Sequence, residues 1–374
     1  MAKILFITHH PREDASSRYR VYDFVPYLEA AGHTCTVRPF STERLFRILR
    51  RGGHSAVKVL HAVFCSIRRM RDILEAGSYD LVLINREAYP FFTPFVEKLL
   101  MAQCGNVVYN FDDAVYMGHG QLRGLGSPLL YKMKYGAGFN DLIRDSKLVL
   151  GGSQALVDYA LQFNTNVALV PTVIDLQAYV YNPRPVDSQE PITVGWLGSN
   201  STSPYLPAIE PALRRLAENN PGRVRFRFVG DAKLRMDLPN CEILPFRLNS
   251  EIEDLGMLDI GLMPLHDTPW TRCKCSFKAI QYMGVGAVPV VSPVGMAASL
   301  IEHGVDGFHA TTENDWYERL QELLDDPMLR LRMAASARAK VEENYAMQSW
   351  GPKFASLIER ELESREYVSS QVPA

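Results

Sequence analysis

The chain contains 374 residues, of which 47% are hydrophobic and 22% are charged, and its formal net charge is -2. This length exceeds what a single hydrophobic core usually serves, so we expect two domains. The near-neutral charge argues against a globally basic nucleic-acid-binding protein, so any anion-binding site must be local. The six cysteines lack C-x-x-C spacing and indicate neither a zinc knuckle nor a disulfide framework, which fits a reducing cytoplasm.

Short apolar runs alternate with longer amphipathic segments in the first half of the chain. The runs are KILFITHH, TCTVRPF, LVLINRE, NVVYNFDD, KLVLGGS and VALVPTV. This alternation predicts a parallel α/β sheet. The opening run is too short for a signal peptide and is expected to be the first strand. No window supplies the roughly 20 apolar residues that a membrane-spanning helix needs.

Two arginines follow the first expected strand, in PREDASSRYR. This segment lacks the G-x-G-x-x-G fingerprint, which argues against an NAD or FAD enzyme. Ser16 and Ser17 are expected to cap the next helix, with Arg18 and Arg20 in its first turn. The helix dipole disfavours cations there unless an anion lies nearby, so the pair indicates either an anion site or arginines that are solvated or paired with acids.

Polar residues also follow the third and fourth expected strands. Arg86 and Glu87 follow LVLIN, and Asp112 and Asp113 follow VVYNF. If the two strands are neighbours, these side chains form the polar floor of a cleft. The alternative is that they simply cap the helices that follow.

The segment 44–71 is rich in cations and carries interleaved apolar residues. A basic amphipathic segment of this kind can lie on an anionic membrane surface, or it can be a solvated outer helix. Its cations are Arg44, Arg47, Arg50, Arg51, Lys58, Arg68, Arg69 and Arg71.

The second half of the chain repeats the strand and helix alternation after a proline-rich stretch. Residues 179–191, YVYNPRPVDSQEP, are expected to form a linker. The runs ITVGWLGS, VRFRFVGD, CEILPF, IGLMPL, VPVVSP and GFHAT then predict a second sheet. We therefore expect Rossmann-like domains at 1–178 and 192–346, with ligands bound at the carboxyl ends of strands in the cleft between them. The helix expected over 347–374 carries an apolar stripe and is expected to pack back on the first domain.

A turn and a helix start in the second half are candidate phosphate sites. Gly198, Ser199 and Asn200 join a strand to a helix, and the N–H groups of such a turn can bind phosphate, although many βα loops look alike.

Three cations gather at the start of a helix expected over 275–284. Arg272, Lys274 and Lys278 lie at or before its first turns. Like charges repel each other and the positive end of the helix dipole, which costs a few tenths of a kcal/mol each. A diphosphate held between them would remove this penalty.

The second half resembles retaining glycosyltransferases of family 4, which have the GT-B fold. The resemblance rests on GWLGSNS, FVGD, IGLMPLHDTPW, KCSFKAIQYMGVGAVPVVSPVG and GVDGF, and in the first half mainly on layout, SSRYR and NFDDAVY. It implies transfer of a sugar from a nucleotide diphosphate sugar to an acceptor, with no metal and no further cofactor. The same fold also hosts nucleotide-sugar epimerases, and a non-catalytic nucleotide-sugar-binding protein is a further alternative.

The resemblance also implies roles for individual residues around the donor. The family carries two glutamates eight positions apart, and the matching positions here hold Cys273 and Gln281. Gln281 can still bond the donor ribose, whereas Cys273 cannot replace a carboxylate, so the chain resembles a divergent branch with lysines around K-C-x-F-K. The remaining donor contacts implied are the backbone N–H groups of Cys275 and Ser276 at the distal phosphate, and Phe246 and Arg247 near the base.

Catalysis in such a transferase requires positive charge beside the leaving diphosphate. The expected catalytic groups are Arg272, Lys274 and Lys278. The base that deprotonates the acceptor is expected to be either the departing phosphate or Asp112. The acceptor is expected to be a polysaccharide, a lipid-linked glycan or a small molecule, handled in the cytoplasm or at the inner membrane face through segment 44–71. The residues expected on the acceptor side are Arg18, Arg20, Arg86, Glu87 and Asp113.

Overall fold

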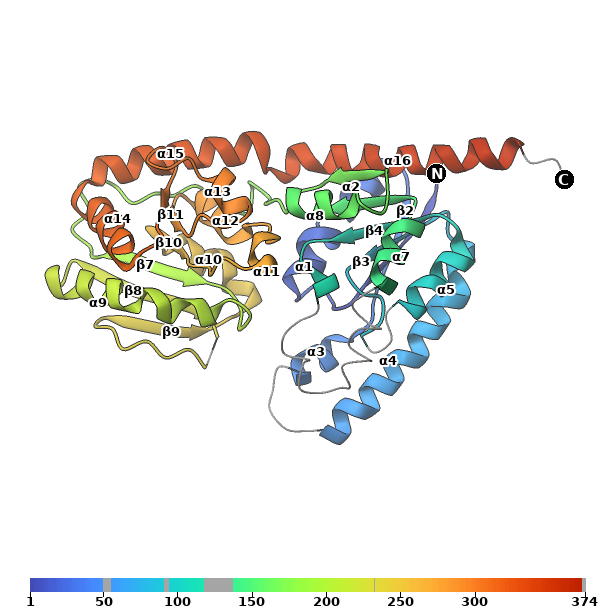
Figure 1. Ribbon diagram of the computed structural model, residues 1–374, viewed down its shortest axis with the longest axis horizontal. Coiled ribbons are helices and arrows are strands. Elements are labelled where there is room, and N and C mark those ends of the chain that lie inside the picture. Colours follow the sequence, from blue (N-terminus) through green and yellow to red (C-terminus); the bar gives the residue numbers. More distant parts are fainter. Residues whose placement is uncertain (50–54, 91–93, 118–136, 232, 372–374) are drawn as a thin grey trace. The chain divides into compact units, whose positions relative to one another are not determined.

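The computed structural model describes residues 1–49, 55–90, 94–117, 137–231 and 233–371 (Figure 1). The chain divides into two compact units, one made of Met1–Thr172 with Trp350–Ala374 and the other of Val173–Ser349. Each unit contains a parallel six-stranded sheet accompanied by helices. The expected fold class, two Rossmann-like α/β domains and a C-terminal helical tail, is confirmed.

The sheet of the first unit has the strand order β2-β1-β3-β4-β5-β6. Its central strands β3, β4 and β5 are buried along their whole length, which explains why they are continuous apolar runs in the sequence. The strands are β1 (Lys3–Thr8), β2 (Thr34–Pro39), β3 (Leu81–Asn85), β4 (Val107–Phe111), β5 (Leu148–Gly151) and β6 (Val167–Leu169). The helices are α1 (Ala15–Ser17), the π-helix η1 (Arg18–Tyr22), α2 (Val25–Ala30), α3 (Glu43–Leu49), α4 (Ser55–Glu75), the 3₁₀ helix η2 (Ala76–Ser78), α5 (Phe95–Cys104), the 3₁₀ helix η3 (Val115–Met117), α7 (Ala137–Asp145), α8 (Gln154–Ala160) and, from Trp350 on, α16 (Met347–Gln371).

The sheet of the second unit has the strand order β12-β11-β10-β7-β8-β9. Its strands are β7 (Ile192–Leu197), β8 (Val224–Gly230), β9 (Cys241–Pro245), β10 (Ile260–Met263), β11 (Val288–Val291) and β12 (Phe308–His309). Its helices are the 3₁₀ helix η5 (Ser203–Ile209), α9 (Glu210–Asn219), the 3₁₀ helix η6 (Leu248–Ser250), α10 (Glu251–Gly256), α11 (Pro269–Arg272), α12 (Phe277–Val285), α13 (Met296–Leu300), α14 (Glu313–Asp325) and α15 (Pro327–Asn344). The twelve apolar runs expected as strands thus correspond to the twelve strands of the described residues.

The strand order of the second unit reverses between β7 and β10, which are parallel neighbours. In open α/β sheets the crevice beyond the carboxyl ends of two such strands is the usual ligand position. Helix α12 packs closely on β10 there because Gly261 has no side chain: a Cβ at this position would collide with the ring of Tyr282. Tyr282 in turn donates a hydrogen bond to the carbonyl of Leu262 (3.1 Å). This contact fixes where α12 begins relative to the sheet.

Three helix starts differ from the sequence expectation. Asp14, rather than Ser16 or Ser17, caps α1, because its carboxylate accepts a hydrogen bond from the Ser17 N–H (3.1 Å). For the helix after β7, Ser203 followed by Pro204 predicts a cap at Ser203, but the helix begins at Ser203 and Thr202 is the cap residue. Helix α12 begins at Phe277, two residues later than expected, since Ser276 adopts a left-handed conformation that ends the preceding segment.

The third cation of the expected cluster, Arg272, belongs to a separate helix, α11. This short helix is closed at its start by a capping box between Thr268 and Thr271. Arg272 and Lys274 thus lie before α12 and Lys278 in its first turn, as the sequence position of the three cations implies.

Candidate functional site

Lys278, in the first turn of α12, lies across the loop that follows β7. Its Nζ is 6.0 Å from the centroid of the Trp196 ring. A Cβ built at Gly198 would lie 2.5 Å from Lys278 Cε and would also collide with the indole of Trp196. The lack of a side chain at Gly198 therefore allows the lysine to occupy this position. Two motifs that are 80 residues apart in the sequence, the turn after β7 and the cationic helix start, are brought together.

The turn after β7 is compact and exposes its polar groups. Ser199 and Asn200 are exposed, and the Ser199 hydroxyl is 2.8 Å from that of Ser201. The N–H groups of Thr202 and Ser203 both donate to the carbonyl of Ser199 (3.0 Å each). Ser203 also donates from its hydroxyl to Asp231 (2.5 Å), which lowers the pKa of that carboxyl.

Ser276, just before α12, combines backbone strain with an unpaired hydroxyl. Its φ of 49° lies in the left-handed region, which residues with a side chain rarely adopt. The side chain is 4% exposed, and its Oγ has no hydrogen-bond partner among the described residues. Strained residues and orphaned buried polar groups are concentrated at binding sites. Because the helix N-terminus also carries partial positive charge, this position suits a phosphate oxygen.

The other two cations of the expected cluster have partners in the second unit. Arg272 is exposed and makes a bidentate ion pair with Asp267 (2.6 and 2.9 Å). This hydrogen bonding raises the pKa of Arg272 and lowers that of Asp267. The Nζ of Lys274 is 5.7 Å from the ring centroid of Trp270. Lys278, by contrast, lies against Gly198 in the turn after β7.

Gln281 is buried in the second turn of α12 and is bonded within the unit. Its amide nitrogen donates to the hydroxyl of Tyr179 (2.8 Å) and to a carboxylate oxygen of Glu251 (3.1 Å). Glu251, also buried, was missed by sequence reasoning, because three acidic residues in the first turn of α10 are also the pattern of a solvated helix start. Only the three-dimensional structure shows that this carboxylate turns inward to Gln281.

The remaining donor positions expected from the sequence differ in exposure. Phe246 is half-buried against the core around α12, and Arg247 is exposed. Cys273 and Cys275 are both buried, and the Cys273 thiol is 3.4 Å from the carbonyl of Pro269.

In the first unit, the polar residues that follow β3 and β4 form one cluster. Arg86 Nε lies 3.8 Å from an oxygen of Asp112, and its Nη2 lies 3.7 Å from one of Asp113. Ser16 donates from its hydroxyl to Asp112 (2.9 Å). Burial raises the pKa of Asp112, against the opposing effect of Arg86. Arg86 itself has a φ of 62° and is held there by its backbone hydrogen bond to the Asn110 carbonyl (2.8 Å).

A buried polar network lies beneath this cluster. The guanidinium of Arg20 donates to the side chain of Asn110 and to the carbonyl of Val170. Asn110 donates to Asn85 (2.9 Å), which in turn reaches the hydroxyl of Ser16 (3.5 Å). The two asparagines were missed by sequence reasoning, although each is a polar residue in an otherwise apolar strand, which was a usable signal.

The other acceptor-side residues make local contacts. The Arg18 guanidinium is buried and stacks 4.5 Å from the ring centroid of Tyr19. Glu87 lies 3.3 Å from Nδ1 of His9.

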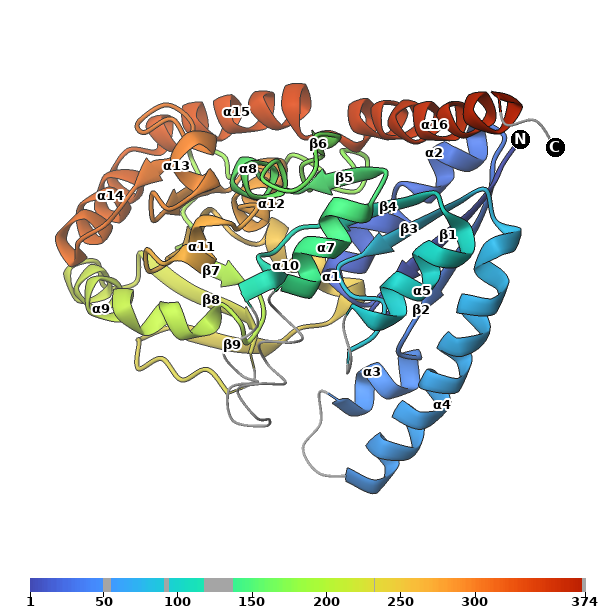
Figure 2. The same ribbon diagram turned by 45° about the vertical axis from the view of Figure 1, so that its right-hand side comes forward.

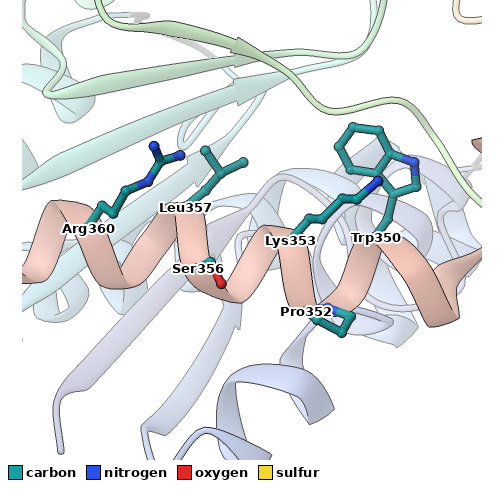
Figure 3. A pocket seen from close by; sticks show the side chains of 6 residues that line it. All are labelled: Trp350, Pro352, Lys353, Ser356, Leu357 and Arg360. Atoms are coloured by element: carbon teal, nitrogen blue, oxygen red, sulfur yellow. The ribbon is translucent and has the colours of Figure 1, made fainter.

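Two further features bear on ligands. The described residues contain no group of three or more His, Cys, Asp or Glu side chains that could hold a metal ion. A pocket of about 470 Å³ lies along α16, where Trp350, Lys353, Leu357 and Arg360 extend from one side of the helix (Figure 3). None of the expected site residues lines it.

Comparison with known proteins finds similar folds over nearly the whole chain and a family match over part of the second unit. Residues 193–326 match the family model described as Glycosyl transferases group 1. No curated protein matches the chain in sequence. The chain has a GT-B-like fold, and the match to the family model covers the segment that contains Gly198, Ser276 and Lys278.

Several solved structures resemble the chain over nearly its full length. Anabaena HepE in complex with UDP and glucose has a TM-score of 0.69 at 16% identity, covering 96% of this chain and 100% of that one. Sucrose-phosphate synthase from Thermosynechococcus elongatus has a TM-score of 0.70 at 14% identity, covering 97% and 100%. A glycosyltransferase from Rickettsia africae has a TM-score of 0.64 at 14% identity, covering 96% and 98%.

Proposed function

We propose that the chain is a glycosyltransferase that moves a sugar from a nucleotide diphosphate sugar to an acceptor, with retention of anomeric configuration. The observation that carries this proposal is the contact of Lys278 with Gly198 beside the unpaired hydroxyl of Ser276, inside the segment that matches group 1 glycosyl transferases. Structures similar in fold include HepE in complex with UDP-glucose. The divergent branch without the glutamate pair stays a prediction.

The leaving diphosphate gains negative charge as the glycosidic bond to the donor breaks, so the transition state is stabilised by fixed cations and N–H dipoles. In this proposal Lys278 and the start of α12 bind the diphosphate, and Ser276 donates its hydroxyl to a phosphate oxygen. Lys274 adds charge nearby. Arg272 contributes only if it leaves Asp267, because its guanidinium is already neutralised by that carboxylate.

The donor ribose is assigned to the pair formed by Gln281 and Glu251. Both amide protons of Gln281 are used by Tyr179 and Glu251, so its carbonyl oxygen is left as the acceptor for a ribose hydroxyl. The carboxylate of Glu251 is a second candidate acceptor, oriented by Gln281. This arrangement offsets the absence of a glutamate at position 281.

Activation of the acceptor is assigned to Asp112. Its raised pKa makes this carboxylate a better base than an ordinary aspartate, and Ser16 and Arg86 hold its orientation. The acceptor is a polysaccharide, a lipid-linked glycan or a small molecule. Independence from metal ions and contact of segment 44–71 with a membrane surface stay predictions.

The test is nucleotide release by the full chain, supplied in turn with UDP, GDP, ADP and TDP sugars, with and without a panel of acceptors. Transfer requires a free nucleoside diphosphate and a glycosylated acceptor in equal amounts. Lys278→Ala is expected to reduce turnover by about 10²–10³. Lys147→Ala, at an exposed lysine of the first unit, is the matched control.

Two other results would contradict this proposal and support a different function. Conversion of the nucleotide sugar into an isomer, without released diphosphate, would identify an epimerase. Ligand-induced stabilisation by a nucleotide sugar without turnover on any acceptor would identify a binding protein.

A further inference from the structure

The outer face of α4 is apolar along the whole helix. Helices on a protein surface normally bury their apolar stripe and expose their polar side, and α4 does the opposite. The exposed apolar residues recur at helical spacing. They are Val57, Val59, Leu60, Val63, Phe64, Ile67, Met70 and Leu74. Leu60, Ile67 and Leu74 are between 67% and 75% exposed.

The inner face of α4 is held to the first unit mainly by polar contacts. The buried guanidinium of Arg69 donates to the carbonyls of Thr8 (3.1 Å) and Arg38 (3.3 Å), and Asp72 accepts from the guanidinium of Arg38 on β2 (3.0 Å). Arg68 donates to the carbonyl of Phe40 (3.1 Å). Next to them, Cys65 packs into a small apolar cluster. Rotating the helix to bury its apolar stripe would break all of these contacts, so the orientation is fixed.

Such a stripe requires an explanation. Single exposed apolar residues are normal on protein surfaces, but a continuous apolar row on one helix marks a surface that something covers. Figure 2 shows α4 along the outside of the first unit, beside α5, with the strands of the sheet on its inner side. A helix of 21 residues is about 30 Å long, so the stripe presents a long, narrow docking surface.

We propose that α4 lies in the surface of an anionic lipid bilayer, with this stripe at the boundary of the acyl chains. The exposed charges on α3 and α4 support a lipid partner. Arg44 and Arg47 on α3 and Arg71 on α4 are exposed cations, although Arg47 pairs with Glu43 (3.0 Å) and Arg71 with Glu75 (2.6 Å) on the same helices. Interfacial helices typically join an apolar face to flanking Lys and Arg. Arg50 and Arg51 of the expected basic segment lie outside the described residues.

The composition of the stripe favours a bilayer over a protein partner. Protein interfaces concentrate binding energy in Trp, Tyr and Arg, whereas this stripe is aliphatic apart from Phe64 and contains no hydrogen-bonding side chain. In the described part of the chain, no helix has both the length and the apolar character to cross a bilayer. The geometry therefore fits a helix that lies on the membrane.

The test uses the full chain and vesicles of equal parts phosphatidylglycerol and phosphatidylcholine. Replacing Leu60, Ile67 and Leu74 together by Glu is expected to weaken vesicle binding by about 100-fold or more, because three immersed side chains become charged. The matched control replaces Leu161, Met257 and Met328 by Glu, since these residues are at least 50% exposed elsewhere on the chain. The control must bind like the parent, and an equal loss in the control would overturn the assignment.

The charge contribution is tested with pure phosphatidylcholine vesicles and with added salt. Binding is expected to be weaker on the neutral vesicles and to fall as ionic strength rises. Equal binding to neutral and anionic vesicles would overturn the anionic-surface assignment. Failure of the parent to bind either vesicle would overturn the proposal as a whole.

A second measurement tests whether the stripe enters the bilayer and does not depend on the folding of the Glu variant. Phe64→Trp is expected to place a fluorophore in the bilayer, where brominated lipid quenches the added emission, and Leu161→Trp is expected to give no quenching. Sedimentation equilibrium of the parent without lipid tests the competing occupant. A dimer that the Glu substitutions on α4 convert to a monomer would show that a second copy covers the stripe and would refute the bilayer.

Discussion

The contact between Gly198 and Lys278 yields a prediction that follows directly from geometry. In Gly198→Ala, the new methyl group would lie 2.5 Å from Lys278 Cε and closer still to the ring of Trp196. The lysine is flexible and can move, whereas Trp196 is 1% exposed and cannot. We expect Lys278 to be displaced from the turn, with an overpacking cost of about 1–3 kcal/mol in the free energy of unfolding.

Gly198→Ala should reduce the rate of sugar transfer about as much as removal of the Lys278 side chain does. If Lys278 stabilises the leaving diphosphate, Lys278→Ala costs about 10²–10³ in turnover, which is roughly 2.7–4 kcal/mol of transition-state stabilisation. Gly198→Ala should approach the same loss, because it acts by displacing the same side chain. The double variant should then be no slower than Lys278→Ala alone, which gives a coupling energy of about 2.7–4 kcal/mol, the full effect of Gly198→Ala.

The assay is donor-dependent release of nucleoside diphosphate by the four members of this cycle, with thermal unfolding of each. Gly256→Ala in α10 is the control, because a Cβ at that position would meet no atom within 4 Å. Effects of Gly198→Ala and Lys278→Ala that simply add would refute the reasoning. Unchanged turnover in Lys278→Ala would refute the diphosphate site itself.

Three further predictions concern buried polar groups and metal ions. Burial raises the pKa of Glu97 to about 7. Between the ordinary carboxyl pKa and pH 7, the folded state therefore keeps a proton that the unfolded state has released. The free energy of unfolding falls as pH rises across this range. Glu97→Gln keeps an acceptor for the Ala88 N–H (2.8 Å) and should remove a penalty of up to about 3 kcal/mol at pH 8 but not at pH 4, measured by urea unfolding. Gln281→Ala leaves the buried carboxylate of Glu251 without its amide donor. The free energy of unfolding should fall by about 1–3 kcal/mol, and affinity for the donor should fall as well. Wild-type stability of this variant in calorimetry would contradict the pairing of Gln281 with Glu251. Because cations and helix dipoles are assigned to the diphosphate, EDTA should leave the transfer rate unchanged, and recovery of a lost rate by Mg²⁺ would contradict this assignment.

The strands and their order of appearance were predictable from the sequence because parallel strands between helices are apolar on both faces. The runs LVLIN and VVYNF became β3 and β4 for this reason. The adjacency of Arg86 to Asp112 and Asp113 followed from the expectation that these strands are neighbours. Local periodicity and strand adjacency were thus enough to predict the strands and the proximity of these side chains.

Three features of the site in the second unit were not predictable in the same way. The sequence shows three cations near position 275, but the ion pair of Arg272 with Asp267 depends on how the segment before α11 folds. The left-handed conformation of Ser276 gives no sequence signal, because serine is an ordinary cap residue. The inward turn of Glu251 depends on Gln281, thirty positions away.

Helix α4 shows the same limit most clearly, because its pattern predicts an amphipathic helix but not which face is buried. A hydrophobic stripe alone would be expected to face the sheet. Here the polar face turns inward, because Arg69 satisfies carbonyls at the carboxyl ends of β1 and β2 and also pairs with Asp72. Burial lowers the pKa of Arg69 to about 10, which still leaves it charged at neutral pH, and Asp72 compensates that buried charge. Turning the apolar face inward would leave the carbonyls of Thr8 and Arg38 without their donor and would separate Asp72 from Arg38, so the apolar face remains outside even though water solvates it poorly.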